Sequence, residues 1–281
     1  MDTGAHDHDH DHEHGHDHEH GHRHEHGHGH GHEHGHGHDH HDHDRADEAD
    51  HVHAQPSPRM IALERDVLAK NDLLAARNRG WLEGREILAL NIMSSPGAGK
   101  TTLLERTIAR LGGAAISVIE GDQATLRDAE RIRAAGARAI QINTGTGCHL
   151  DAGMVAGALR KLAPAARSMV FIENVGNLVC PALFDLGESA RVVVASVTEG
   201  EDKPLKYPHM FRACDVVVLN KVDLLPHVAF DTAHFVDLAR RIRPEVRVFE
   251  VSATRGDGLD AWCHWLEHAR LEVEPCRVVD S

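Results

Sequence analysis

The segment over residues 94–102 constrains the fold more than any other part of the chain. It reads Ser-Ser-Pro-Gly-Ala-Gly-Lys-Thr-Thr, and it matches the phosphate-binding pattern G-x-x-x-x-G-K-S/T except that Ser94 replaces the first glycine. Because an apolar run precedes it and a helical stretch follows, we expect a strand–loop–helix unit whose backbone N–H groups and helix dipole bind nucleotide phosphates. Lys100 would lie near the β- and γ-phosphates and Thr101 would bind Mg²⁺. The candidate contacts are Ser95, Pro96, Gly97, Ala98, Gly99, Lys100, Thr101 and Thr102.

Short apolar, β-branched runs alternate with helix-length segments after this loop. The runs cover residues 87–93, 115–120, 139–142, 169–173, 191–197, 216–220 and 246–251. This alternation predicts an α/β fold, a mostly parallel sheet flanked by helices, with ligands at the carboxyl ends of the strands.

A helix is expected before the first strand. Apolar residues recur at helical spacing over residues 60–79, and Gly80 is expected to end the helix. We assign residues 59–281 to one nucleotide-binding domain, in which residues 59–84 form an N-terminal helical extension.

The apolar run at 216–220 leads into Asn-Lys-Val-Asp, an N-K-x-D pattern. The carboxylate of Asp223 can accept from both N1–H and N2–H₂ of guanine, whereas adenine offers no matching pair of donors. Asn220 can brace the loop, and the stem of Lys221 can cover the base. Ser252 and Ala253, after the last run, supply a second turn beside the guanine. The alternative for Asp223 is a simple helix cap, but the paired motifs favour guanine.

Acidic residues follow two other runs. Glu173 occupies the place where GTPases carry an acid directed at magnesium, and Gly176 the place of an N–H to the γ-phosphate. Asp122 could hold a water bound to Mg²⁺, and Asp128 could position the attacking water, although either could only begin a helix. We expect Lys100, Asp122 and Glu173 to be catalytic. Turnover should be slow, since no arginine is placed as an obvious finger from the same chain.

Cysteine and histidine gather in two loops at strand ends. Cys148 and His149 follow the loop 143–147, and Cys180 comes seven residues after Glu173. Two thiolates and an imidazole suit Zn²⁺ or Ni²⁺, and three ligands leave room for a second subunit or a water. The other thiols are expected in the core and a helical histidine pair is expected to be exposed: Cys214 and Cys263, and His264 with His268.

The first 53 residues differ in kind from the rest. Histidine fills every even position from His6 to His40, and His41, His43, His51 and His53 complete a set of 22. The spacers are mostly Asp, Glu and Gly, which gives no apolar face, so we expect a disordered, metal-binding tail over His6 to His53 and a linker that ends at residue 58. A purification tag and a solubilising tail are the alternatives, but a tag is normally a contiguous histidine run.

Charge and hydropathy exclude several partners. The tail contains 15 acidic and two basic residues, a formal charge of −13, which leaves −1 on the remaining 228 residues. A near-neutral body argues against nucleic acid as a partner. No apolar run approaches about 18 residues, and Met1 opens a charged segment rather than a signal peptide, so no membrane is expected. Five scattered cysteines fit a reducing compartment, and we expect a cytoplasmic protein.

These motifs together resemble the HypB family, the nickel-incorporation GTPases of [NiFe]-hydrogenase maturation. The resemblance rests on SSPGAGKTTLL, the EGD segment, NTGTGCHLDA, FIENVGNLVCP, TEGEDKPLKYP, NKVDLL and VSATRGDGL, in the family's order over roughly residues 85–260. It implies a P-loop GTPase of the SIMIBI class that forms a homodimer on GTP, with Cys148, His149 and Cys180 as a nickel or zinc site at the dimer interface.

The resemblance also implies cofactors and partners. GTP, Mg²⁺, Ni²⁺ and Zn²⁺ are the expected ligands, and a HypA-like nickel-delivery protein and the hydrogenase large subunit are the expected partners. The chain lacks the short Cys-rich motif that opens some members, and its tail resembles that of members credited with nickel storage. A urease-type nickel GTPase and a nickel-storage protein that does not hydrolyse GTP are the alternatives.

Deletion of residues 2–53 should remove most of the bound nickel and leave GTP hydrolysis unchanged, because the tail contains none of the nucleotide motifs. Nickel per chain and phosphate release, measured in the parent and truncated proteins, check this prediction. Binding by the tail should fall below pH ~6, where imidazoles with a pKa of about 6.5 become protonated. Equal nickel stoichiometry in the two proteins would contradict a storage role.

Overall fold

The computed structural model describes residues 58–121, 126–144 and 149–273. The histidines of the tail, Asp122 and Cys148 therefore lie outside the described residues. One sheet contains β1 (Leu88–Ser94), β2 (Ile116–Glu120), β3 (Arg138–Gln141), β4 (Met169–Glu173), β5 (Ala190–Ser196), β6 (Val216–Asn220) and β7 (Arg247–Val251). Their order is β3-β2-β4-β1-β5-β6-β7, and each neighbouring pair is parallel. The predicted α/β fold and its strand segments are confirmed.

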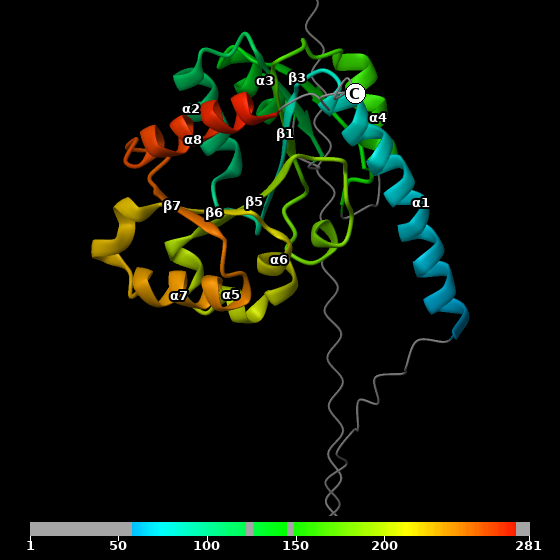
Figure 1. Cartoon of the computed structure of the whole chain (residues 1–281). Coiled ribbons are helices and arrows are strands. Elements are labelled where there is room, and N and C mark those ends of the chain that lie inside the picture. The colour runs from blue at the N-terminus through cyan, green and yellow to red at the C-terminus, as the bar shows by residue number, and fades with distance from the viewer. Residues whose placement is uncertain (1–57, 122–125, 145–148, 274–281) are drawn as a thin grey trace, which may run out of the picture. The chain divides into compact units, whose positions relative to one another are not determined.

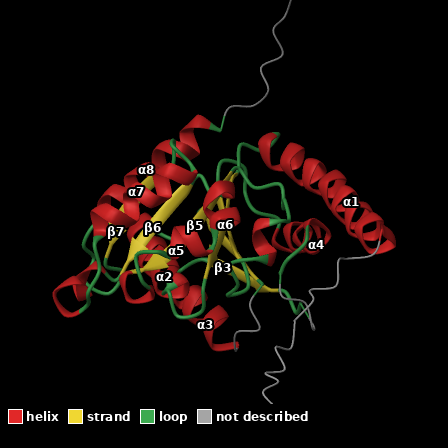
Figure 2. Ribbon diagram, turned by 90° about the horizontal axis from the view of Figure 1, so that it is seen from below, coloured by secondary structure: helices red, strands yellow, loops and turns green. Residues whose placement is uncertain are grey.

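Helices cover both faces of this sheet (Figure 2). They are α1 (Pro58–Glu83), α2 (Lys100–Leu111), α3 (Leu126–Ala134), α4 (Ala152–Leu162), α5 (Lys203–Lys206), α6 (Pro208–Ala213), α7 (Thr232–Ile242) and α8 (Leu259–Glu272). Short 3₁₀ turns lie at Cys180–Ala182, Val197–Glu199 and Val222–His227. In the described part of the chain, no helix combines the length and the apolar character that a membrane crossing requires.

The alternation of side chains along the strands builds a core on each face. Leu90 and Ile92 of β1 pack with residues of α2, α3 and α8, whereas Met93 packs with residues of α6 and α7. A third cluster joins Ala89 to residues of α1 and α4. All seven residues of β1 are buried. Burial on both faces explains why inner strands such as β1 and β4 read as nearly continuous apolar runs in the sequence.

The first helix runs three residues beyond Gly80, so the expected end at Gly80 is wrong. Contacts on both sides of the glycine explain the difference. The side chain of Asn78 donates to the carbonyl oxygen of Ala152 at 2.8 Å, and Leu82, only 2% exposed, packs against α4. These contacts offset the roughly 1 kcal/mol that a glycine costs inside a helix. Figure 1 shows α1 lying alongside α4.

Candidate functional site

The phosphate-binding loop connects β1 to α2, and two of its glycines have left-handed backbone conformations. Gly97 has a φ of 77° and Gly99 a φ of 96°. A Cβ on Gly99 would lie only 2.5 Å from Nδ2 of Asn220, whereas a Cβ on Gly97 would meet nothing within 4 Å. Gly99 is therefore required both by its backbone conformation and by the close approach of Asn220.

A cavity of about 350 Å³ opens over this loop. Lys100, at the start of α2, is 7% exposed, and its Nζ donates to Oγ of Ser94 at 2.9 Å. The residue that replaces the first glycine of the pattern thus holds the lysine at the cavity. The cavity is lined by Ser94, Pro96, Gly97, Ala98, Gly99, Lys100, Thr101, Thr102, Arg131, Glu173, Val175 and Gly176.

Thr101 and Glu173 lie together in the cavity, as the sequence predicts for a magnesium site. The hydroxyl of Thr101 donates to Oε1 of Glu173 at 3.0 Å, and Glu173 is 3% exposed at the end of β4. Gly176 passes close to Pro96, since a Cβ there would lie 3.5 Å from that proline. A hydroxyl and a carboxylate are oxygen ligands that suit Mg²⁺, so the residues present fit the ion.

Asp128 and an unexpected arginine lie on α3. Asp128 accepts from Arg131 at 3.2 Å, and Arg131 also donates to both carboxylate oxygens of Glu105, at 2.8 and 2.6 Å. An arginine therefore does line the phosphate cavity, held there by two carboxylates. A single arginine inside a helix follows no pattern that would have identified it from the sequence.

Ser95 contacts two side chains for which the sequence predicts no role. Its hydroxyl hydrogen-bonds to Glu199, and Nζ of Lys203 donates to Oγ of Ser95 at 2.5 Å. Lys203 and Glu199 also form an ion pair at 2.7 Å, with Lys203 only 7% exposed. Both residues lie in TEGEDKPLKYP, one of the segments that carry the family resemblance. The resemblance does not predict that this segment contacts the phosphate loop.

The expected guanine-side residues are joined by hydrogen bonds. Nδ2 of Asn220 donates to the carbonyl oxygen of Ala98 at 2.9 Å, and its Oδ1 accepts from the backbone N–H of Ala253 at 3.1 Å. Lys221, at a φ of 63°, donates from Nζ to the carbonyl oxygen of Gly97 at 2.7 Å. Asn220 thus braces the phosphate loop against the last turn, as predicted for this residue.

Asp223 is fixed from the same last turn. Its Oδ1 accepts from the hydroxyl of Ser252 at 2.6 Å, and Ser252 is fully buried after β7. Asp223 lies within the 3₁₀ turn Val222–His227 and does not cap a helix, because Lys221 is the capping residue. The hydrogen bond from Ser252 fixes the orientation of the Asp223 carboxylate. The two segments that the sequence assigned to the guanine therefore meet.

His149 lies against the segment that follows Cys180. Its ring stacks on Phe184, with centroids 3.9 Å apart, and Phe184 comes four residues after Cys180. Burial lowers the pKa of His149 more than nearby Asp151 raises it, which favours the neutral form of the imidazole. A neutral imidazole next to a thiol-bearing segment suits Ni²⁺ or Zn²⁺.

The described residues alone do not complete a metal site. Among them, no group of three or more His, Cys, Asp or Glu side chains could hold a metal ion, and Cys148 lies outside the described part. The predictions for the other thiols and histidines are confirmed. Burial raises the pKa of Cys214 to about 12 and that of Cys263 to about 11, and His264 and His268 are exposed on α8.

Comparisons with known proteins agree on one family. The model of the CobW/HypB/UreG nucleotide-binding domain matches residues 88–250. Hydrogenase maturation factor HypB of Rhizobium leguminosarum bv. viciae is 58% identical over 218 residues, which are 77% of this chain and 73% of that protein.

Solved structures give the same result. HypB of Archaeoglobus fulgidus is 42% identical with a TM-score of 0.68, over 72% of this chain and 100% of that one. HypB of Helicobacter pylori in complex with nickel is 38% identical with a TM-score of 0.67, over 72% of this chain and 96% of that one.

Two glycine substitutions should separate backbone strain from contact with Asn220. Gly97→Ala and Gly99→Ala each place a side chain in a left-handed conformation, at about 1–2 kcal/mol. Only Gly99→Ala also displaces Asn220, so it should lower GTP affinity and the urea midpoint further than Gly97→Ala does. Binding of a fluorescent GTP analogue and urea unfolding measure both effects. Equal losses in the two variants would contradict the assigned role of the Asn220 contact.

Proposed function

This chain belongs to the HypB family, and from that premise we propose that it hydrolyses GTP to deliver nickel for the assembly of the [NiFe]-hydrogenase active site. One observation carries the proposal. Lys100, Thr101 and Glu173 line one cavity, and the N-K-x-D segment contacts the loop of that cavity through Asn220. We further propose that the reaction is slow without a partner and that the protein acts in the cytoplasm.

The residues of the cavity have separable tasks. Lys100 stabilises negative charge on the β- and γ-phosphates, and Thr101 with Glu173 holds Mg²⁺, which neutralises further charge when it is bound. Gly176 offers its N–H to the γ-phosphate. Asp122 and Asp128 orient water around this assembly. Asp223 selects guanine by accepting from both of its donors.

Nickel is the cargo of the reaction. We propose that Cys148, His149 and Cys180 hold Ni²⁺, or Zn²⁺ in its place, and that two chains share these ligands in a dimer formed with GTP. The tail over His6 to His53 would store further nickel. A HypA-like protein would supply the ion, and the hydrogenase large subunit would receive it.

The stacking of His149 on Phe184 supports this arrangement, because it brings the segments of two proposed ligands together.

The two alternative functions make different predictions. A urease-type nickel GTPase would serve a different partner, and a nickel-storage protein would not hydrolyse GTP. Relatives that are 58% and 55% identical are named hydrogenase maturation factors, which favours the hydrogenase over a urease. The lysine, threonine and acid of the cavity are all present, which favours hydrolysis over storage alone.

Lys100→Ala should lower GTP turnover on the order of 10²–10³-fold, because a charge that stabilises the transition state is lost. Asp223→Asn should narrow the preference for GTP over inosine triphosphate, which lacks N2–H₂. Phosphate release and nucleotide competition measure these effects, with Lys161→Ala on the exposed end of α4 as a control. Turnover by Lys100→Ala at the parent rate would refute the assigned site.

Cys180→Ala should remove most of the near-ultraviolet absorption that thiolate–nickel bonds give, while nickel on the cysteine-free tail remains. Cys214→Ala is the matched control, since that thiol is buried with a pKa of about 12 and is no thiolate at pH 7. Absorption spectra and nickel per chain, with sedimentation in GDP and in a GTP analogue, measure the site and the dimer. Equal absorption losses in both variants would contradict Cys180 as a ligand.

A further inference from the structure

One buried carboxamide contacts both the nucleotide-sensing turn and the segment of the candidate metal ligands. Asn174 directly follows Glu173 and is 0% exposed. Its Oδ1 accepts from the backbone N–H of Val175 at 3.0 Å, in the turn that leads to Gly176. The same oxygen accepts from the backbone N–H of Leu150 at 3.2 Å, one residue after His149.

Leu150 is also held from a second direction. Its side chain is fully buried, and it packs so closely on Gly121 that a Cβ there would lie 2.4 Å from Cγ of Leu150. Leu150 therefore lies between the segments that follow β2 and β4, which are the two expected to contact Mg²⁺ and the γ-phosphate. Because one peptide bond joins Leu150 to His149, a shift of Leu150 moves the imidazole.

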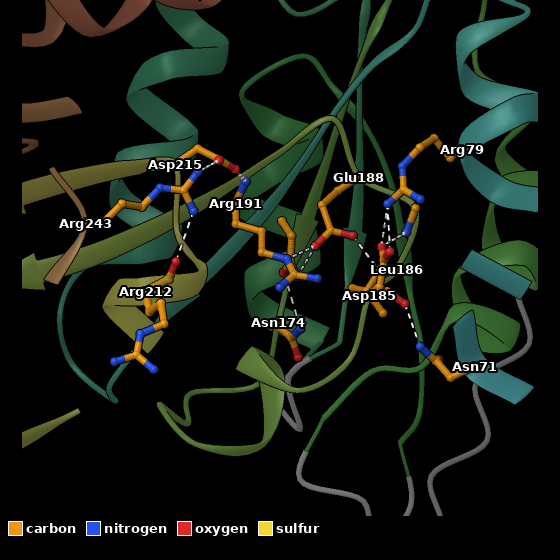
Figure 3. Close-up of polar contacts among 12 residues, drawn as sticks. Asn71, Arg79, Asn174, Asp185, Leu186, Glu188, Arg191, Arg212, Asp215 and Arg243 are labelled. Atoms are coloured by element: carbon orange, nitrogen blue, oxygen red, sulfur yellow. Dashed lines mark hydrogen bonds and ion pairs between the residues drawn. The ribbon is translucent and has the colours of Figure 1, made fainter. Parts of the chain in front are cut away.

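The other end of the Asn174 carboxamide is fixed to the sheet. Its Nδ2 donates to Oδ1 of Asn91 on β1 at 3.3 Å, and Nδ2 of Asn91 donates to Glu188 at 3.3 Å. Glu188 accepts from Arg191 at 2.6 Å and from the backbone N–H of Leu186 at 2.7 Å (Figure 3). This chain of hydrogen bonds limits rotation of the carboxamide, so its Oδ1 moves with the backbone of Asn174 rather than by a change of side-chain rotamer.

We propose that Asn174 is a positioning residue that couples the nucleotide state to the ligand segment at His149. This inference rests on the proposed function, in which GTP and nickel bind to the same chain. When the turn at Val175 moves to meet a γ-phosphate, Oδ1 must follow it or leave the partly buried N–H of Val175 without its partner, which costs free energy. The N–H groups of Val175 and Leu150 therefore shift together. Since linkage is reciprocal, nickel biases the nucleotide state by the same factor.

The test measures nickel affinity of the full-length protein at buffered free nickel, with GDP and with a non-hydrolysable GTP analogue. Thiolate–nickel absorption reports the candidate site alone, because the tail has no cysteine. In the parent we expect the two affinities to differ roughly 5–150-fold, as is usual for coupled sites. Asn174→Ala should reduce that ratio to about one. Asn174→Asp keeps the accepting oxygen but loses the donor to Asn91, so its ratio should lie between that of Asn174→Ala and that of the parent.

Thr107→Ala is the matched control. Thr107 is also 0% exposed, and its hydroxyl makes two hydrogen bonds, to the carbonyl oxygen of Leu103 and from Nε1 of Trp262, outside the network that holds Asn174. It should lower the melting temperature and keep the parent ratio. Loss of the ratio in Thr107→Ala as well would show general loosening of the structure and would overturn the role proposed for Asn174.

Two other results would also overturn the role proposed for Asn174. If Asn174→Ala keeps the affinity ratio of the parent, only the role of Asn174 is refuted. If the parent itself has a ratio of one, the coupling of GTP to nickel is refuted as well. If circular dichroism shows that Asn174→Ala is unfolded, Asn91→Ala is tested in its place. This variant removes the acceptor for Nδ2 of Asn174 and should lower the ratio, so an unchanged ratio in Asn91→Ala overturns the proposal.

Discussion

Parallel pairing throughout the sheet is the constraint on which the candidate site depends. The carboxyl ends of parallel strands meet at one edge, so loops far apart in sequence become neighbours. Glu120 of β2 and Glu173 of β4 are direct register partners, and Glu173 also lies opposite Ile92 of β1. Across the sheet, β6 ends at Asn220 near enough to Ala98 for a hydrogen bond that spans 122 residues of sequence. Without this edge, neither the contact of Thr101 with Glu173 nor that of Asn220 with Ala98 could form.

The features that were predictable from the sequence are those that a contiguous segment determines. Strands buried on both faces favour apolar, β-branched residues at most positions, which is why the runs of β1, β2, β4, β5 and β6 were visible. The edge strands β3 and β7 are only partly buried. The phosphate loop and N-K-x-D segment are likewise local patterns. The contacts of Ser95 with Lys203 and of Arg131 with Glu105 were not predictable, because each joins distant segments and neither partner follows a spacing rule.

The first helix shows how tertiary contacts change the meaning of a local signal. The low helix propensity of Gly80 predicts the end of a helix, but buried contacts on both sides of this glycine keep the helix continuous. Asn71 and Asn78 of α1 bind the N–H and the carbonyl oxygen of Ala152, at 2.9 and 2.8 Å. The same asparagines donate to the carbonyl oxygens of Asp185 and Leu186. The segment predicted as an extension is therefore part of the frame around the ligand loops.

This frame determines where movement near the proposed metal ligands can occur. Asp151 caps α4 by accepting from the N–H of Met154 at 2.8 Å, and α1 holds Ala152 at both of its backbone groups. The chain is thus fixed from Asp151 onward. Leu150 lies just before this fixed segment. Its backbone N–H donates to Oδ1 of Asn174, which directly follows Glu173. A displacement passed through Asn174 is therefore confined to Leu150 and His149, since α4 cannot yield without breaking the asparagine contacts.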